Sequence, residues 1–304
     1  MDVMTLSLWA AAYLALGAFS GFFAGLLGIG GGLVMVPALT MMFAAQPQFP
    51  PGEVLHLALG TSMATIIFTA VASLRTHHSH GAVLWGVFRT ITPGILLGTG
   101  VGTLFASSVP TRPLAIFFAF FVSIVALQMA MNLKPKPSRE LPGALGIGAV
   151  GFGIGALSSL VAIGGGALTV PFLTWCNVRV QNAIGTSAAV GLPIAIGGTL
   201  GYIFNGWREP GLPVGSLGFV YLPALAVLVV ATTSSTQAQL GPLAMLTGKI
   251  HNDEYFGEQE VYYIELDATL PVARPGGSSI DLPLDVTYQG CADAGLCYPP
   301  ITKQ

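Results

Sequence analysis

The chain has 304 residues, of which 53% are hydrophobic and only 8% are charged, and its mean hydropathy is +0.75. Soluble domains carry roughly 25% charged residues, so this composition excludes a soluble globular protein. The apolar content also excludes a disordered chain, although glycine occurs 40 times. Residues 1–235 carry a net charge of +4, and residues 236–304 carry a net charge of −6. This shift predicts a membrane part followed by a separate, water-facing tail.

Long apolar runs predict membrane helices, because a helix needs about 20 apolar residues to cross a bilayer core of roughly 30 Å. Asp2 precedes the first run and no Lys or Arg does, so we expect this run to remain as a membrane helix rather than act as a cleaved signal. The seven runs are Leu6–Leu27, Leu57–Leu74, Trp85–Phe105, Leu114–Met131, Gly143–Ile163, Ala183–Phe204 and Leu217–Thr232.

A short glycine-rich element occurs twice, at Ile29–Pro37 and at Ile163–Pro171. Each copy holds three consecutive glycines and a proline at the same offset, and each is followed by a Gly-Thr-Ser tripeptide. Two paired motifs in the same order predict two internal repeats. The apolar runs after the glycines, Leu33–Ala45 and Ala167–Cys176, are too short to span the bilayer alone. We therefore expect half-helices that follow glycine-broken segments, the pattern that points to a transporter's binding site.

The repeated motifs predict an anion site. Glycines allow backbone N–H groups to face a bound group, and the first turn of a helix adds free donors and a positive dipole end. The apolar runs contain no Asp or Glu that would favour a cation. Two alternatives stay open: the glycines could serve helix packing, and the hydroxyls could bond to their own helices. The predicted substrate-binding residues are Gly30, Gly31, Gly32, Thr61, Ser62, Gly164, Gly165, Gly166, Thr186 and Ser187.

The expected organisation has four parts: a first membrane repeat at 1–133, a basic linker at 134–142, a shorter second repeat at 143–235, and a tail at 236–304. Lys and Arg in short loops report orientation. If the short helices re-enter the membrane, six of the loop Lys and Arg residues lie on the cytoplasmic side and two on the outer side. If the short helices span the membrane, the numbers are the same. Loop charge therefore leaves both schemes open.

Other polar residues in the membrane part favour ordinary roles. His77, His78 and His80 have no carboxylate or cysteine nearby in sequence, so we expect a solvated loop rather than a metal site. Cys176 is expected to be a buried small hydrophobe. We expect no metal, no cofactor and no nucleic-acid partner.

Residues 1 to about 231 resemble the TauE/SafE family of sulfite exporters. The matching stretches are Gly21–Gly32 with Pro37, Gly60–Ser62, their second-half counterparts, and Leu217–Ala224. The resemblance implies secondary transport of a small sulfur oxyanion, such as sulfite or a sulfonate, across a bacterial inner membrane. It also implies that the paired glycine loops hold the anion.

The tail resembles a different family. Asp253–Val261 and Tyr288–Pro300 are similar to the N-terminal periplasmic domain of the thiol:disulfide interchange protein DsbD, over about residues 241–304. The resemblance implies a fragment of an immunoglobulin-like β fold, with Cys291 and Cys297 as a redox pair and Tyr255 as a cap over it. It further implies a periplasmic thioredoxin-like partner. A purely structural disulfide between the two cysteines is the alternative.

Local patterns agree with a β-rich tail. Val261–Leu270 and Asp281–Tyr288 are rich in β-branched and aromatic residues, which predicts strands. A redox pair belongs in an oxidising compartment. This favours a periplasmic tail and, with it, the re-entrant scheme.

The sequence therefore predicts an all-α polytopic membrane protein with two repeats, glycine-broken half-helices and a short β-rich tail. Its expected function is transport rather than catalysis. Two alternatives remain: a membrane-tethered thiol:disulfide interchange protein that uses Cys291 and Cys297, and an inactive fusion product.

Overall fold

The computed structural model describes residues 3–27, 31–131 and 139–235, together with short strands in the tail. The chain divides into two compact units, Met1–Ala238 and Gln239–Gln304, which are described separately. The helices of the first unit are α1 (Val3–Leu27), α2 (Gly32–Ala44), α3 (Val54–Ser79), α4 (Trp85–Ser108), α5 (Thr111–Ala130), α6 (Ala144–Val161), α7 (Gly166–Trp175), α8 (Val180–Gly206) and α9 (Leu222–Ser235).

Within the described ranges, five helices are long and apolar enough to cross a membrane: α3, α4, α5, α6 and α8. A helix suits lipid because its backbone hydrogen bonds form within the segment. Pro93 in α4 and Pro193 in α8 each remove one such bond. Helices α2 and α7, with 13 and 10 residues, confirm the short helices predicted after the glycines. At 1.5 Å per residue they reach roughly 15–20 Å, about half of a bilayer core.

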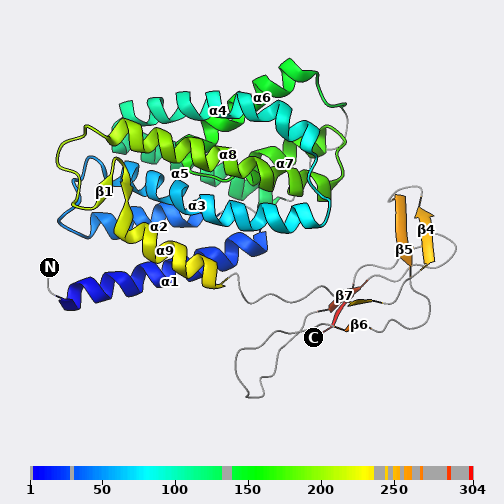
Figure 1. The fold of residues 1–304 in the computed structure, drawn as a ribbon, viewed down its shortest axis with the longest axis horizontal. Coiled ribbons are helices and arrows are strands. Elements are labelled where there is room, and N and C mark those ends of the chain that lie inside the picture. Colours follow the sequence, from blue (N-terminus) through cyan, green and yellow to red (C-terminus); the bar gives the residue numbers. More distant parts are fainter. Residues whose placement is uncertain are drawn as a thin grey trace. The chain divides into compact units, whose positions relative to one another are not determined.

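Helices α3 and α8 pack together at the centre of the bundle (Figure 1). Helix α6 packs on α4 and helix α1 packs on α9, on opposite sides of this central pair. Helix α4 also packs on α8, and α9 also packs on α3. The helix that follows α3 therefore lies against α6 and α8 of the second half, while α9 lies against α1 and α3 of the first. This reciprocal pairing is what two related units would give, although the internal repeat itself stays a prediction.

Glycines bring α4 and α6 together at backbone distance. A Cβ on Gly94 or Gly98 of α4 would strike the carbonyl of Gly148 or Phe152 of α6. Likewise, a Cβ on Gly155 of α6 would strike the carbonyl of Ile95. Small residues at four-residue spacing are the usual means of close helix approach in a membrane. At this interface, therefore, glycines outside the repeated motifs serve helix packing.

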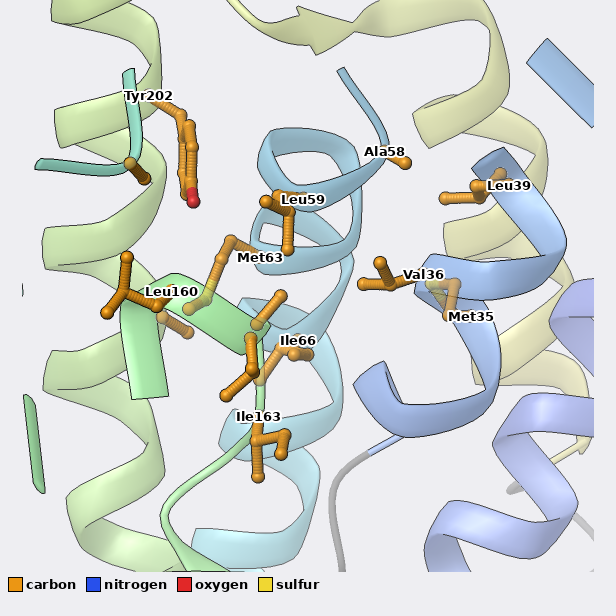
Figure 2. Packing of buried hydrophobic residues seen from close by; sticks show 14 of the residues in the cluster. Met35, Val36, Leu39, Ala58, Leu59, Met63, Ile66, Leu160, Ile163 and Tyr202 are labelled. Carbon is orange, nitrogen blue, oxygen red and sulfur yellow. The ribbon is translucent and has the colours of Figure 1, made fainter. Parts of the chain in front are cut away.

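The core joins both halves. Figure 2 shows Met35 and Val36 of α2 on one side of α3, and Leu160 and Ile163 of the second half beside Met63 on its other side. All five side chains belong to one cluster of buried residues. Helix α5 contributes less to this core, because its large apolar side chains Ile116, Phe120, Ile124 and Leu127 are exposed. Such a face suits contact with lipid.

The last apolar run differs from expectation. We predicted a helix over Leu217–Thr232, but strands β1 (Ser216–Leu217) and β2 (Val220–Tyr221) form a small antiparallel hairpin before α9 begins. Gly218 turns the chain there with φ +56°, a left-handed conformation that glycine adopts without steric cost. Because the chain reverses at Gly218, the helix starts at Leu222.

The second unit is described only in its strands, which pair antiparallel as β3–β6, β4–β5 and β7–β8. They confirm β structure in the tail. Strands β6 and β7 fall within the predicted strands Val261–Leu270 and Asp281–Tyr288, whose other residues, apart from Val261 at the end of β5, lie outside the described residues. The strands are β3 (Ala244–Met245), β4 (Lys249–Asp253), β5 (Gly257–Val261), β6 (Ala268–Thr269), β7 (Val286–Tyr288) and β8 (Ile301–Lys303).

Candidate functional site

The two glycine loops meet in the core of the bundle. A Cβ on Gly32, the first residue of α2, would overlap the carbonyl oxygen of Ala162, which closes α6 just before the second loop. Ala162 has φ 47° and ψ 42°, so its carbonyl is turned out of the helix direction. The structure therefore brings together the two motifs that the sequence predicts as one site.

Each loop opens a helix that has no capping side chain, because the N-cap residues are Gly31 and Gly165. In α2 the first intrahelical bonds are those from Val34 and Met35 to the Gly31 carbonyl. The N–H groups of the first turn precede these bonds and remain as donors, and the helix dipole adds positive potential there. This arrangement can bind an anion without a cationic side chain.

Of the glycines predicted at the site, Gly31, Gly32, Gly164, Gly165 and Gly166 are placed at the loops and first helical turns. Gly30 lies outside the described residues. Gly32, Gly164 and Gly165 are buried, whereas Gly31 and Gly166 are partly exposed.

The two Gly-Thr-Ser motifs make matching contacts between the halves. Thr61 Oγ1 accepts a hydrogen bond from the N–H of Tyr221 at 3.0 Å, and Thr186 Oγ1 accepts one from the N–H of Leu84 at 2.9 Å. Tyr221 and Leu84 are the residues just before α9 and α4. Each threonine hydroxyl thus satisfies a backbone donor at the start of the other half's helix, a role that sequence reasoning missed.

The glycines of the same motifs permit these contacts. A Cβ on Gly60 would strike the carbonyl of Phe219, and a Cβ on Gly185 would strike the carbonyl of Ala82. Phe219 and Ala82 both lie three residues before the start of the contacted helix. The offset is the same in the two halves, as the predicted repeat would give.

The serines of the motifs differ. Ser187 Oγ donates to the Ile184 carbonyl at 2.7 Å. This agrees with the alternative that the hydroxyls bond to their own helices. Ser62 is buried, and its hydroxyl has no hydrogen-bond partner among the described residues. A buried polar group without a partner is costly unless a ligand or water satisfies it.

A small recess opens beside the first loop. Its walls come from α1, α2, α3 and α9, and four of the lining residues carry hydroxyl groups. The sequence contained a pattern that could have pointed to these hydroxyls. Thr61, Thr65 and Thr69 recur every four residues and so lie on one face of α3. The lining residues are Ser20, Gly21, Gly31, Met35, Thr65, Ile66, Thr69 and Thr232.

The histidine cluster is not placed as predicted. His77 and His78 belong to the last turn of α3 instead of a loop, where histidine is favourable to the helix dipole. His80 follows the helix and its Nδ1 lies 2.7 Å from the Thr76 carbonyl. In the part of the chain that the structure describes, no group of three or more metal-binding side chains comes together.

Sequence reasoning also missed a buried histidine at the start of α3. The Nε2 of His56 lies 3.0 Å from the Ala106 carbonyl and 3.2 Å from the Val109 carbonyl, at the end of α4. Two carbonyl acceptors require this nitrogen to be the donor. The carboxylate of Glu53 lies 2.9 Å from Nδ1. The sequence could have pointed to this contact, because His56 follows Glu53 by three residues. We missed it because His56 lies just before the predicted apolar run Leu57–Leu74.

The tail residues predicted as a redox site lie outside the described residues. These are Tyr255, Cys291 and Cys297. The third cysteine, Cys176, is buried between α7 and α8, as predicted. Burial raises the pKa of its thiol, and the nearby Arg139 guanidinium lowers it to a smaller extent.

The fold and the paired loops define a polytopic helical membrane protein of the transporter class, with broken helices that meet at its centre. The chain belongs to the family described as Sulfite exporter TauE/SafE, whose sequence model matches residues 13–250. A second model, Thiol:disulfide interchange protein DsbD, N-terminal, matches residues 219–304. The two-part architecture predicted from the sequence is thus confirmed.

The similar proteins match either the membrane part or the tail of this chain. A "Probable membrane transporter protein" of Haemophilus influenzae is 38% identical over 236 residues, which cover 76% of this chain and 87% of the relative. "Probable membrane transporter protein YunE" of Bacillus subtilis is 28% identical over 51% of this chain and 64% of the relative. "Thiol:disulfide interchange protein DsbD 1" of Pseudomonas aeruginosa is 50% identical over 68 residues, which are 22% of this chain and 11% of the relative. No solved structure matches the chain.

Proposed function

We propose that the protein is a secondary membrane transporter of small sulfur-containing anions, of the sulfite or sulfonate class, held at the paired glycine loops. The observation that carries the proposal is the contact between Gly32 and Ala162, which brings two uncapped helix starts to one place. Broken helices at matching places in two halves commonly form transporter binding sites. Backbone donors and helix dipoles favour a negative ligand there.

The charge distribution supports an anionic substrate. The carboxylates of residues 1–235 are Asp2, Glu53, Glu140 and Glu209, and all of them precede or follow a helix. A cation carrier would commonly place a carboxylate inside the membrane. The family description, Sulfite exporter TauE/SafE, supports the sulfur oxyanion class.

Ligand-dependent thermal stability tests this function. The full chain, purified in detergent, is heated with sulfite, sulfate, thiosulfate, a sulfonate, or chloride as the control. A ligand that binds the folded state raises the apparent melting temperature, and the rise increases with the ratio of ligand concentration to Kd. We expect selective stabilisation by a sulfur oxyanion, and its loss when Gly31 or Gly165 is replaced by leucine. A folded protein that responds to none of these anions would contradict the proposal.

We further propose that the protein lies in a bacterial inner membrane with its tail in the periplasm. The resemblance of the tail to a domain of a thiol:disulfide interchange protein supports this orientation, because a redox pair needs an oxidising compartment. Labelling of intact cells with a membrane-impermeant thiol reagent, after mild reduction, tests it. We expect Cys291 and Cys297 to be labelled, and their protection would contradict both the orientation and the re-entrant scheme.

A second candidate function is thiol:disulfide interchange by the tail, with Cys291 and Cys297 as the redox pair, Tyr255 as its cap and a thioredoxin-like protein as partner. The 50% identity to a DsbD over 68 residues supports it. Residues 1–235 contain a single cysteine, Cys176, and one thiol cannot relay a dithiol exchange. Reduction of the tail in membranes of cells that lack other membrane reductants would favour this function. A third outcome is an inactive fusion product, which an unfolded, protease-sensitive tail together with absent anion binding would reveal.

A further inference from the structure

We propose that the connection between α2 and α3, residues 45–53, is a lid that closes one end of the bundle, and that it opens when an anion passes between that end and the glycine loops. This inference rests on the proposed function and adds a gate to it. The lid follows the end of α2, whereas Gly31 and Gly32 lie at the start of this helix. Alternating access in transporters commonly uses such gating around a fixed central site.

Two glutamines of the lid are bonded to tyrosines on other elements. Gln46 Nε2 donates to the hydroxyl of Tyr13 of α1 at 2.8 Å. Gln48 Nε2 donates to the hydroxyl of Tyr221 of β2 at 3.4 Å and to Oε1 of Gln46 at 3.2 Å. The four side chains therefore form one hydrogen-bonded chain from α1 to β2, which we call the latch.

Aromatic rings pack beside the latch. Phe49 of the lid stacks on Phe43, in the last turn of α2, with ring centroids 4.3 Å apart. The ring of Tyr221 meets Phe49 and Phe43 edge to face, at 5.0 and 5.8 Å, and the ring of Tyr13 meets Phe43 at 6.2 Å. All four rings are buried. They fill the space between α1, the end of α2 and β2, so an anion cannot pass there while the lid is closed.

The lid is attached to the other elements through side chains. Among the described residues, each backbone hydrogen bond that the lid donates runs to a carbonyl three or four positions earlier. Pro47, Pro50 and Pro51 have no N–H to donate. The hydroxyl of Thr111 donates to the carbonyl of Gly52 near the α3 end of the lid. Neutral hydrogen bonds and ring contacts are individually weak, so the lid can open without unfolding a helix.

The tyrosine on the β2 side of the latch is held in place independently of the lid. Tyr221 pairs with Ser216 in the hairpin, and its N–H donates to Thr61 Oγ1 at 3.0 Å. When the lid moves, we therefore expect Gln48 to leave Tyr221 rather than to carry it along. Thr61 belongs to a Gly-Thr-Ser motif, so the latch is bonded directly to a residue of the candidate site.

The matching connection in the second half is much shorter. Thirty positions separate Gly31 from Thr61, but only 21 separate Gly165 from Thr186. The residues between α7 and α8 are 176–179. Because the second half folds with the shorter connection, the predicted repeat does not require the longer one. The additional residues of the first half, which include latch and ring positions, are thus available for a function such as gating.

Locking the lid tests the inference on the full chain in sealed vesicles. The variant Q48C/Y221C places thiols at one contact of the latch, and a short bifunctional methanethiosulfonate joins them through a reducible bridge. The parent chain treated with the same reagent is the control for its three native cysteines. We expect cross-linking to reduce uptake of radiolabelled methanesulfonate by the variant to the level of empty vesicles, and reduction with dithiothreitol to restore it.

Opening the lid gives a second readout that needs no substrate. Leu39 lies one turn before Phe43 on α2 and is fully buried (Figure 2), so the thiol of L39C reports exposure of the space behind the rings. We expect a water-soluble maleimide to modify L39C roughly tenfold faster or more when Y13F/Y221F removes both latch hydroxyls. Mass spectrometry distinguishes this thiol from the native ones.

The matched control for the unlatched variant is Y202F. It removes a buried tyrosine hydroxyl outside the lid, which donates to the Ser159 carbonyl at 2.9 Å. We expect Y202F to leave the modification rate of L39C unchanged. An equal rise in both variants would show general loosening of the bundle and would overturn the lid.

The remaining outcomes separate the lid from the proposed function. Uptake that continues at the parent rate after complete cross-linking would overturn the lid alone, as would an unchanged modification rate of L39C in Y13F/Y221F. No uptake by the folded parent chain would overturn the proposed function, and this inference with it. If Q48C/Y221C does not fold or does not transport before cross-linking, Q46C/Y13C places the bridge at the other contact of the latch.

Discussion

Thr61 accepts the backbone N–H of Tyr221 at 3.0 Å, and this bond joins the middle of the first half to the start of the last helix of the second half. Thr186 makes the corresponding bond to Leu84, at the start of α4, at 2.9 Å. The first turn of a helix leaves N–H groups without intrahelical partners. A threonine from the opposite half supplies the nearby acceptor in both cases, so the halves complete each other's helices.

We predict that T61V and T186V each lower the free energy of unfolding by about 1–3 kcal/mol, because valine keeps the shape but leaves the buried N–H of Tyr221 or the partly buried N–H of Leu84 unpaired. Melting temperatures of the purified variants in detergent measure the effect. The serine variants, T61S and T186S, retain the hydroxyl and should stay close to the parent chain. Equal stability of the valine and serine variants would show that these bonds do not hold the halves together.

Glycine packing between α4 and α6 gives a matched pair of variants on one helix. A Cβ at Gly155 would strike the Ile95 carbonyl, whereas a Cβ at Gly153 would meet open space. We expect G155A to destabilise the protein by about 1–3 kcal/mol through overpacking. G153A should be neutral, or more stable by up to about 1 kcal/mol, because alanine has the higher helix propensity. Thermal denaturation that ranks the two variants in the reverse order would refute the close approach of these helices.

His56 ties the start of α3 to the end of α4 through the carbonyls of Ala106 and Val109. We predict that H56A destabilises the protein by about 1–3 kcal/mol, because two buried carbonyls lose a shared donor. The exposed His80 is the control, and H80A should leave the melting temperature unchanged. A similar melting temperature for H56A and H80A would contradict a structural role for the buried ring.

Cys176 should react slowly with thiol reagents while the protein is folded. Its side chain is buried, and burial raises the pKa of the thiol, so less of the reactive thiolate is present at neutral pH. The rate of modification by a small maleimide should rise with pH and increase strongly on denaturation. Rapid modification of the native protein at neutral pH would show that the α7–α8 turn opens, and would make this thiol available for redox exchange.

The helical class and the short helices could be predicted from the sequence. In lipid, few structures satisfy all backbone hydrogen-bonding groups, and the length of an apolar run shows whether a helix can span the bilayer. The hairpin before α9 could not be predicted in this way. Residues 217–221 are apolar enough to continue a helix, and the left-handed turn at Gly218 interrupts it. Hydropathy contains no information about such a turn.

The candidate site could be predicted only in part. Duplicated glycines pointed to two loops, but the contact of Gly32 with Ala162 and the bond of Thr61 to Tyr221 join residues far apart in the chain, the latter pair by 160 positions. A single sequence without its fold does not identify such partners. The recess hydroxyls were overlooked because Thr65 and Thr69 count as tolerable polar residues in an apolar helix.

The most direct test of the central claim is uptake into sealed vesicles reconstituted with the purified full chain. Radiolabelled hydrogensulfite or methanesulfonate is supplied outside, and G32L, which blocks the meeting of the loops, is the matched negative control after its folding in detergent has been verified. The account predicts saturable uptake that unlabelled substrate competes away and that G32L abolishes. Uptake no greater than in empty vesicles, from a parent chain shown to be folded, would contradict it.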